Sequence, residues 1–321
     1  MQKHVLYGLW ITLTFVVAAC RATPANAPPA NAPPSERSNT STTTKATVAA
    51  PSAAPVSSGY ADVNGLKIYY EAHGQGKPIV LVHGSYMNIP MNWRHVIPAL
   101  ARDRQVIVAE MQGHGRTRDA NREFSYEGMA DDVSGLLKRL NIASSDVLGY
   151  SMGAGVAFQA AVRHPEQIRR VVILSGVYAH DGWWPDAEAS FATMNADTFK
   201  GTPIEKAYLE FGNDAARFPE FVKKVISIDL KKYDWSKEVK GLKAPVFIVI
   251  GDVDGVRYEH ALELFRALGG GKMGDIHGLP KSRLAILPGT THIGILQRVD
   301  WWIPMVTDFL DSDLSPKPPT F

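Results

Sequence analysis

The pentapeptide Gly149-Tyr150-Ser151-Met152-Gly153 follows a short expected strand, residues 146–148, and precedes a stretch of small residues, 153–161. A serine between two glycines at this spacing is typical of a sharp turn that joins a strand to a helix. The glycines let the neighbouring strand and helix approach closely, and the turn aims the serine hydroxyl away from the sheet. Pro165 ends the expected helix. We therefore predict that Ser151 is a nucleophile on a strand-to-helix elbow.

Short apolar runs rich in branched residues recur along the chain and predict strands that are buried on both faces. These runs are residues 79–82, 106–109, 147–148, 171–174, 246–250 and 284–287. Asn64-Gly65 suits a two-residue turn and predicts a hairpin from Tyr60 to Ala72. Apolar residues from Met129 to Leu140 recur at helical spacing. This alternation predicts an α/β fold with a doubly wound, mostly parallel sheet.

The alternation of strands and helices is interrupted between residues 178 and 240. This segment is expected to be mainly helical and is rich in aromatic residues such as Trp183, Trp184 and Phe191. We interpret this segment as a small helical subdomain that also forms a lid over an apolar substrate pocket. The core would then consist of residues 59–177 and 241–315, with a short tail at 316–321. A glycine-rich stretch at 269–281 lengthens the connection before the last strand and is expected to be a surface loop.

A serine nucleophile needs a base and an acid that orients the base, and both candidates follow expected strands. His292 lies in a loop after the run 284–287, whereas His260 and His277 are expected to be solvated surface residues. Asp252 and Asp254 both follow the run 246–250. We favour Asp254 as the orienting acid and expect Asp252 to bind backbone N–H groups in the turn. The alternative is that Asp252 is the orienting acid. The order serine, acid, histidine is one of the known orders of such triads.

The same chemistry needs donors for a developing oxyanion. Residues 83–86, His-Gly-Ser-Tyr, follow the run 79–82, so the backbone N–H of Ser85 is one candidate. The elbow supplies the N–H of Met152 as the second. His83 is expected to be structural, and Trp93 is expected to lie in the core.

Taken together, these motifs resemble those of the α/β-hydrolase superfamily. The resemblance covers nearly all of residues 60–310 and includes His83-Gly84, the loop from Gln112 to Arg116, the elbow, Gly251 to Asp254, and Gly289 to His292, in family order. It implies an α/β-hydrolase fold with a helical lid and hydrolysis of small to medium apolar carboxylic esters through an acyl-enzyme, with no metal and no organic cofactor. Ser151 argues against the members that use an aspartate nucleophile.

Other activities use similar triads, so lactonase, aminopeptidase, C–C bond hydrolase, thioesterase and cofactor-free haloperoxidase activities stay open. An aminopeptidase would need acidic lid residues to hold the substrate amine, and Asp186, Glu188 and Glu205 are available. A non-catalytic surface-displayed binding protein is a further alternative. It would be expected to have lost a member of the triad, and none is lost.

The amino-terminal 58 residues differ from the rest. An uncharged run, residues 5–20, follows Lys3 and His4 and fits a signal peptide at residues 1–19. Its end, Val17-Ala18-Ala19-Cys20, resembles the lipobox of bacterial lipoproteins, which implies lipidation of Cys20, export and anchoring in the cell envelope. Arg21 after the cysteine implies the outer membrane if the source is Gram-negative. Residues 20–58, rich in Ala, Pro, Ser and Thr, are expected to form a disordered tether.

Composition narrows the function classes further. The 321 residues include 34 Lys and Arg against 32 Asp and Glu, a net charge of +2, and 45% are apolar. This balance argues against a nucleic-acid partner, which would need a basic surface. Cys20 is the sole cysteine, so an intramolecular disulfide and a cysteine-based zinc site are excluded. The expected partners are a small ester-type substrate and a membrane reached through the lipid.

Overall fold

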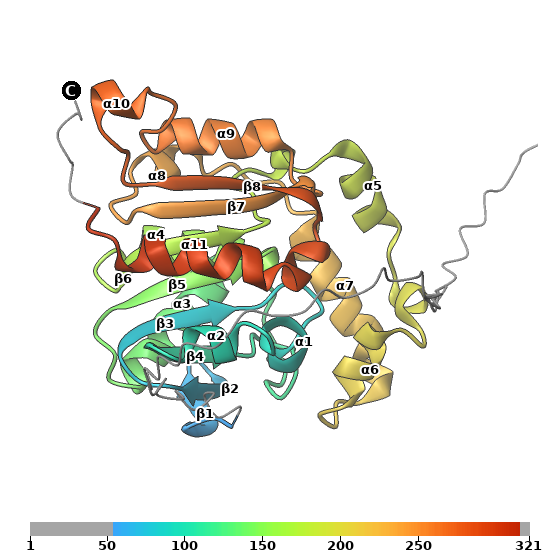
Figure 1. The fold of residues 1–321 in the computed structure, drawn as a ribbon. Coiled ribbons are helices and arrows are strands. Elements are labelled where there is room, and N and C mark those ends of the chain that lie inside the picture. The colour runs from blue at the N-terminus through green and yellow to red at the C-terminus, as the bar shows by residue number, and fades with distance from the viewer. Residues whose placement is uncertain (1–53, 315–321) are drawn as a thin grey trace, which may run out of the picture. The chain divides into compact units, whose positions relative to one another are not determined.

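The computed structural model describes residues 54–314, and Figure 1 shows a central sheet flanked by helices. The expected signal peptide, the lipidation site at Cys20, the tether up to residue 53 and the tail at 316–321 lie outside the described residues. Within residues 54–314, no helix is both long and apolar enough to cross a bilayer.

The sheet has eight strands in the order β1-β2-β4-β3-β5-β6-β7-β8. The first two form an antiparallel hairpin, β2 pairs antiparallel with β4, and the remaining neighbours are parallel. This arrangement confirms the mostly parallel, doubly wound sheet. The strands are β1 (Ser57–Val63), β2 (Leu66–His73), β3 (Lys77–Val82), β4 (Arg104–Ala109), β5 (Ser145–Tyr150), β6 (Ile168–Leu174), β7 (Val246–Val253) and β8 (Arg283–Thr291).

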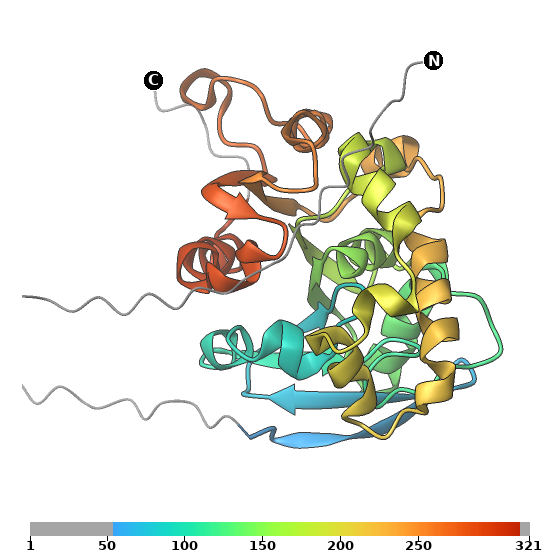
Figure 2. The same ribbon diagram turned by 90° about the vertical axis from the view of Figure 1, so that its right-hand side faces the viewer.

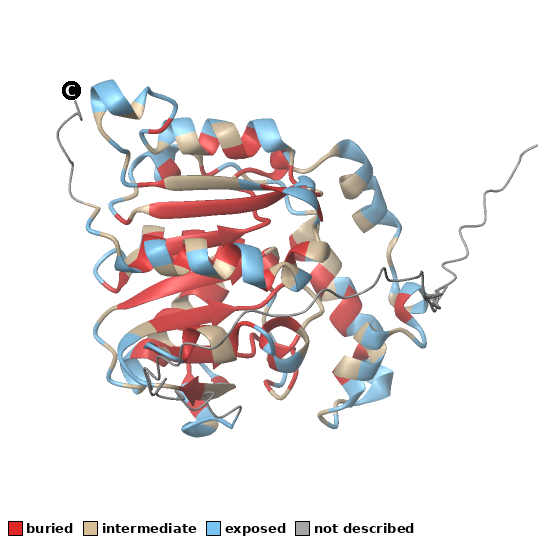
Figure 3. Ribbon diagram, in the orientation of Figure 1, coloured by how far each residue is buried: buried red, intermediate tan, exposed pale blue. Residues whose placement is uncertain are grey.

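Alternate residues of the central strands face two separate cores, which explains why the runs are continuously apolar. On β3, Val80 and Val82 join the core beneath α3 (Tyr126–Arg139) and α4 (Met152–Arg163). Ile79 and Leu81 join the core beneath α1 (Ile89–Trp93), α2 (Ile97–Leu100) and α11 (Val299–Asp311). Figure 3 shows the resulting buried strands between partly exposed helices. The outer helix α9 (Tyr258–Ala267) packs against β7 and β8.

Between β6 and β7 the chain leaves the sheet and forms the segment that we call the insert, residues 178–240. Figure 2 shows its helices stacked beside one end of the core. Its elements are η1 (His180–Gly182), α5 (Pro185–Thr193), η2 (Ala196–Phe199), α6 (Pro203–Leu209), η3 (Ala215–Arg217), α7 (Phe218–Asp229) and α8 (Ser236–Lys240).

Each apolar run expected to form a strand lies inside one, and the hairpin turn at Asn64-Gly65 has positive φ at both residues. Two expectations about the ends of strands were wrong. Asp252 lies within β7 and Pro288–Thr291 lie within β8, because pairing resumes between Val253 and Thr291 after a register shift. The stretch 269–281 holds the short helix α10 (Gly274–His277). After β8, the 3-10 helix η4 (Gly294–Gln297) leads into α11, the last helix of the described residues.

Candidate active site

Ser151 lies on a strained turn between β5 and α4. Its backbone has φ 53° and ψ −117°, a conformation that non-glycine residues rarely adopt. The turn is tightly packed, because a Cβ on Gly149 would lie 2.0 Å from the carbonyl oxygen of Gly153. A Cβ on Gly153 would lie 2.0 Å from the carbonyl oxygen of Val82 on the neighbouring strand. Only glycine fits at these two positions, so the two glycines allow the elbow to form.

The fold brings Ser151, His292 and Asp254 into one hydrogen-bonded series. His292 Nε2 lies 3.0 Å from Ser151 Oγ, and His292 Nδ1 lies 2.7 Å from Asp254 Oδ1. The histidine side chain is 24% exposed and the aspartate side chain is fully buried. In this arrangement the buried carboxylate can fix the ring orientation while the outer nitrogen faces the serine.

Asp254 is held by more than His292. Its Oδ2 accepts hydrogen bonds from Ser175 Oγ at 2.5 Å and from the Gly251 N–H at 3.2 Å, and its Oδ1 accepts from the Val256 N–H at 3.2 Å. Burial pushes the pKa of Asp254 upward, but the hydrogen bonds and the charge of His292 outweigh it, so the pKa is lowered overall. Asp254 is therefore ionised near neutral pH, where its negative charge can stabilise a protonated His292.

Asp252 takes the other role considered for it, although its partner lies on β8 rather than in a turn. Its Oδ1 accepts from the Thr290 N–H at 3.1 Å. Hydrogen bonds from the backbone of Gly289 and Thr290 lower its pKa. Asp252 thus binds the backbone at the end of β8, just before His292. Asp254 contacts the imidazole itself.

Two aromatic residues fix the position of His292. The hydroxyl of Tyr150, the residue before the serine, donates to the His292 carbonyl oxygen at 3.0 Å. The ring of Trp183 meets the imidazole edge-on with centroids 5.6 Å apart. Trp183 is positioned because the start of the insert pairs with the loop after β7, where the Trp184 N–H donates to the Gly255 carbonyl at 3.0 Å. The insert therefore forms one wall around the imidazole.

The loop after β3 lies against the serine. A Cβ on Gly84 would lie 3.3 Å from the Cβ of Ser151, so the backbone of Gly84 and Ser85 passes beside the nucleophile. The N–H of Met152 is at the first position of α4, where the helix itself offers no acceptor. The backbone of Gly84 and the N–H of Met152 therefore lie beside Ser151, and the amino-terminal end of α4 adds a favourable field for negative charge. The oxyanion roles of the Ser85 and Met152 N–H groups stay predictions.

The other histidines are structural or remote. His83 is buried; its Nδ1 hydrogen-bonds the Gly84 carbonyl at 2.9 Å, its Nε2 accepts from the Met111 N–H at 3.0 Å, and burial lowers its pKa to about 4. The expectation that His260 is a solvated surface residue was wrong. It is 2% exposed and stacks on Tyr178 at 4.0 Å, because it lies on the inner face of α9. His277 is exposed, and Trp93 is fully buried as expected.

Sequence reasoning missed two residues beside the site. Ser175 follows β6 directly, and this placement of a polar residue at a strand end was the available signal. Asp229, the last residue of α7, carried no such signal, since only the packing of the insert brings it to the core. It accepts a hydrogen bond from Ser85 Oγ at 3.0 Å. Burial raises its pKa to about 7, although the Ser85 hydrogen bond and the charge of His292 act in the opposite direction.

The three acids of the insert considered as amine ligands are engaged elsewhere. Glu188 forms an ion pair with Lys232, Glu205 accepts from the Gly201 N–H at 2.7 Å, and Asp186 accepts from the Ala187 N–H at 3.0 Å. Among residues 54–314, no group of three or more His, Cys, Asp or Glu side chains is arranged to hold a metal ion.

Comparison with known proteins also indicates an α/β-hydrolase fold. Residues 77–204 match the model of the alpha/beta hydrolase fold family. A 2-hydroxymuconate semialdehyde hydrolase from a Pseudomonas strain is 36% identical over 113 residues, which are 34% of this chain and 40% of that protein. A pimeloyl-[acyl-carrier protein] methyl ester esterase from Aeromonas hydrophila is 32% identical over 161 residues, 47% of this chain and 61% of that protein. Each match spans less than two thirds of the relative.

Solved structures extend the likeness over most of the chain. An enol-lactonase from Burkholderia xenovorans superimposes with a TM-score of 0.61 at 24% identity, covering 79% of this chain and 100% of that one. A meta-cleavage product hydrolase from Pseudomonas fluorescens gives a TM-score of 0.63 at 21% identity, covering 80% of this chain and 98% of that one. At these identities the likeness establishes the fold. The chain has the α/β-hydrolase fold.

Proposed function

We propose that this chain is a member of the α/β-hydrolase superfamily and a serine hydrolase that cleaves carboxylic esters of small to medium apolar substrates. The observation that carries the proposal is the continuous hydrogen-bonded series from Ser151 through His292 to the buried Asp254, with heavy-atom distances of 3.0 and 2.7 Å. A nucleophile, a base and an orienting acid within such distances are the geometric requirement for acyl transfer through a covalent intermediate.

In the proposed reaction the Ser151 hydroxyl attacks the ester carbonyl while His292 Nε2 takes its proton. The Ser85 and Met152 N–H groups hold the oxyanion. As the intermediate collapses, His292 returns the proton to the departing alcohol and Ser151 keeps the acyl group. A water molecule then attacks the acyl-enzyme carbonyl and gives a proton to His292. As the bond between Ser151 Oγ and the acyl carbon breaks, His292 passes that proton to Ser151 Oγ, which releases the carboxylic acid and restores free Ser151. The aromatic wall at Trp183 supports the preference for apolar substrates.

Hydrolysis of a series of aryl esters of increasing acyl length tests the proposal. Ser151→Ala should lower kcat by at least about 10³-fold, because removal of the nucleophile leaves only binding and oxyanion donors. The matched control is Ser190→Ala, an exposed serine of the insert, which should leave kcat unchanged. Retention of most activity in Ser151→Ala would contradict the proposal. A wild-type protein that a fluorophosphonate probe does not label would instead favour the non-catalytic binding protein.

A second candidate is hydrolysis of a carbon–carbon bond or a lactone by the same side chains. It is favoured by the similarity to a protein named 2-hydroxymuconate semialdehyde hydrolase. A panel of esters, lactones, thioesters, aminoacyl arylamides and vinylogous diketones compared by kcat/KM separates these activities. The ester proposal requires the highest kcat/KM on an ester.

We also propose that the chain is exported and held in the bacterial cell envelope by lipid on Cys20, at the outer membrane if the source is Gram-negative. The proposal rests on the sequence Val17-Ala18-Ala19-Cys20 after an uncharged run. In cells, the wild-type chain should fractionate with membranes, whereas Cys20→Ser should not, because acyl chains on the cysteine provide the attachment. An unmodified Cys20 in the mass spectrum of membrane-associated protein would contradict it.

A further inference from the structure

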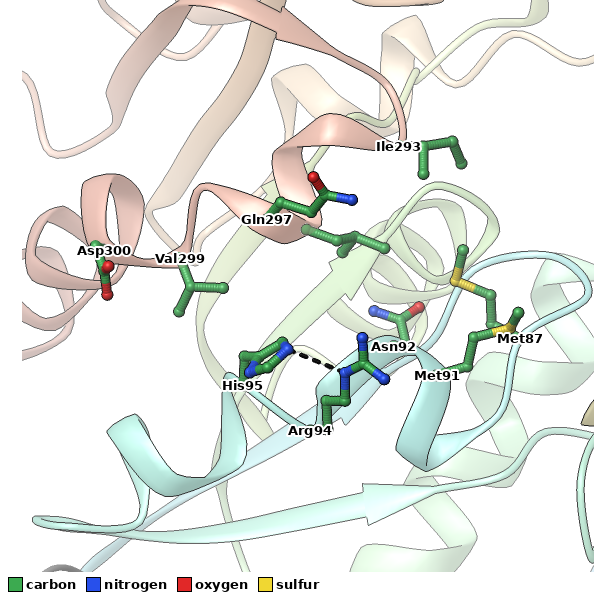
Figure 4. Close-up of a pocket in the computed structure, with 10 residues that line it drawn as sticks. Met87, Met91, Asn92, Arg94, His95, Ile293, Gln297, Val299 and Asp300 are labelled. Atoms are coloured by element: carbon green, nitrogen blue, oxygen red, sulfur yellow. Dashed lines mark hydrogen bonds between the residues drawn. The ribbon is translucent and has the colours of Figure 1, made fainter. Parts of the chain in front are cut away.

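A pocket with a volume of about 460 Å³ lies between α1 on one side and η4 with the start of α11 on the other. Figure 4 shows the side chains that line it. Neither Ser151 nor His292 lines the pocket, but Ile293, the residue after His292, does. The lining consists of Met87, Met91, Asn92, Arg94, His95, Ile293, Leu296, Gln297, Val299 and Asp300. This volume lies in the range of ligand-binding pockets.

Asn92 supplies an unused donor at the pocket wall. The residue is only 4% exposed, and its Oδ1 accepts from the Gly84 N–H at 2.9 Å. That bond fixes which way the amide faces, so Nδ2 must point away from Gly84. Nδ2 is buried and has no hydrogen-bond partner in the structure. A buried amide donor without an acceptor is unfavourable, and an acceptor atom entering the pocket would satisfy it.

Arg94 provides positive charge beside this amide. Its Nε donates to His95 Nε2 at 3.0 Å, and no carboxylate of residues 54–314 lies within ion-pair distance of its guanidinium. In Figure 4 Asn92 and Arg94 come from the α1 side, Gln297 from the opposite side, and Asp300, the one acid of the lining, lies at the end away from Met87. An acceptor group placed near Asn92 and Arg94 would therefore meet donors rather than the acid.

Half of the residues that line the pocket are apolar. Met87, Met91, Ile293, Leu296 and Val299 line the pocket, and Ile293 is 55% exposed. An exposed isoleucine facing a hollow with other apolar side chains is typical of a ligand site, because a ligand would remove this surface from water.

We propose that this pocket binds a small molecule that carries a carboxylate on an apolar chain. The carboxylate would accept hydrogen bonds from Asn92 Nδ2 and from the Arg94 guanidinium, whose planar donors match the two carboxylate oxygens. The chain would lie along Met87, Met91 and Ile293. Binding itself does not depend on the proposed function.

The pocket also touches the catalytic segments. Asn92 holds the Gly84 N–H, the Gly84 backbone borders Ser151, and Ile293 follows His292 directly. This step rests on the proposed function. A carboxylate bound in the pocket would change the rate of ester hydrolysis without occupying the site that holds the ester. Because ester hydrolysis releases a carboxylic acid, the product belongs to the class of ligand that the pocket fits.

Calorimetric titration of the full chain with hexanoate, hexanamide and hexylamine tests the binding proposal. Hexanoate should bind at least about tenfold more tightly than the other two, because only it pairs with Arg94. Arg94→Gln should weaken hexanoate binding by about tenfold, and the matched control Arg102→Gln, an exposed arginine outside the pocket, should not change it. Leu296→Trp should abolish binding by filling the pocket.

Equal binding of hexanoate and hexanamide, or an unchanged Kd in Arg94→Gln, would overturn the proposal. Binding that persists in Leu296→Trp but is lost when Ser151 carries a bulky phosphonate would overturn it as well, because the ligand would then lie in the catalytic cleft. These titrations have a readout even if the chain hydrolyses no ester. Failure of the proposed function and failure of this inference can therefore be told apart.

Discussion

Replacing Asp229 by asparagine should make the protein more stable at pH 8. The carboxyl lies at the end of α7 against Ser85, and burial raises its pKa from the ordinary 3.8 to about 7. Above pH 7 the folded protein therefore holds a carboxylate in surroundings that favour the neutral acid. Asparagine is neutral, nearly the same size, and its side-chain oxygen can still accept from Ser85 Oγ.

The sign and size of the change in the free energy of unfolding follow from proton binding to Asp229. Between about pH 4 and 7 the folded state keeps a proton on Asp229 that the unfolded state has lost, so the free energy of unfolding falls as pH rises through this window and levels off above it. The difference of about three pH units, at about 1.4 kcal/mol each, corresponds to about 4 kcal/mol. Because Asp229 is only partly buried, we expect a measured gain of about 2–4 kcal/mol.

Urea denaturation from pH 4 to pH 9, followed by tryptophan fluorescence, measures the effect. Asp229→Asn and the wild type should be equally stable near pH 4 and diverge up to pH 8. The control is Asp275→Asn at an exposed position, which should track the wild type at every pH. A variant that is less stable than the wild type by the same amount at all pH values would refute the reasoning, because asparagine would then be removing a favourable contact rather than an unfavourable charge.

Three further predictions test the site and the core. Asp254→Asn should preserve the fold but lower kcat by about 10⁴-fold, measured on aryl esters, because the amide favours the wrong imidazole tautomer; a loss below tenfold would contradict its role. Gly153→Ala should destabilise the protein by more than about 2 kcal/mol in urea, since its Cβ would lie 2.0 Å from the Val82 carbonyl oxygen; an unchanged midpoint would be inconsistent with this packing. Trp302→Ala should cost about 3–5 kcal/mol because the side chain is fully buried, whereas the 44% exposed Trp301→Ala should cost less than about 1 kcal/mol; equal thermal shifts would contradict this.

The sequence predicted the strands well, because strands buried on both faces leave uninterrupted apolar runs. It was less accurate at the ends of β7 and β8. There the pairing of Val253 with Thr291 depends on a register shift between two chain segments that lie far apart in sequence. A glycine such as Gly289 predicts a turn, but the same residue type also occurs at the end of a paired strand, so the sequence does not separate the two cases.

The histidines show the same limit. His260 has the polarity of a surface residue, and the sequence predicted that it is solvated. Only the packing of α9 decided that the ring faces inward and stacks on Tyr178. Burial of one side chain depends on the neighbouring element, which a local pattern does not contain.

By itself the sequence determined the α/β architecture, the position of the elbow, Ser151 and His292 as candidate catalytic residues, and Asp252 and Asp254 as the two candidates for the orienting acid. It could do so because each is tied to a local feature: an apolar run followed by a turn with the right residue. Only the tertiary structure decided that Asp254 rather than Asp252 contacts the imidazole, that Ser175 supports it, and that Asp229 of the insert reaches Ser85. Those contacts join segments up to 144 residues apart, so they follow from the packing of elements rather than from any signal along the chain.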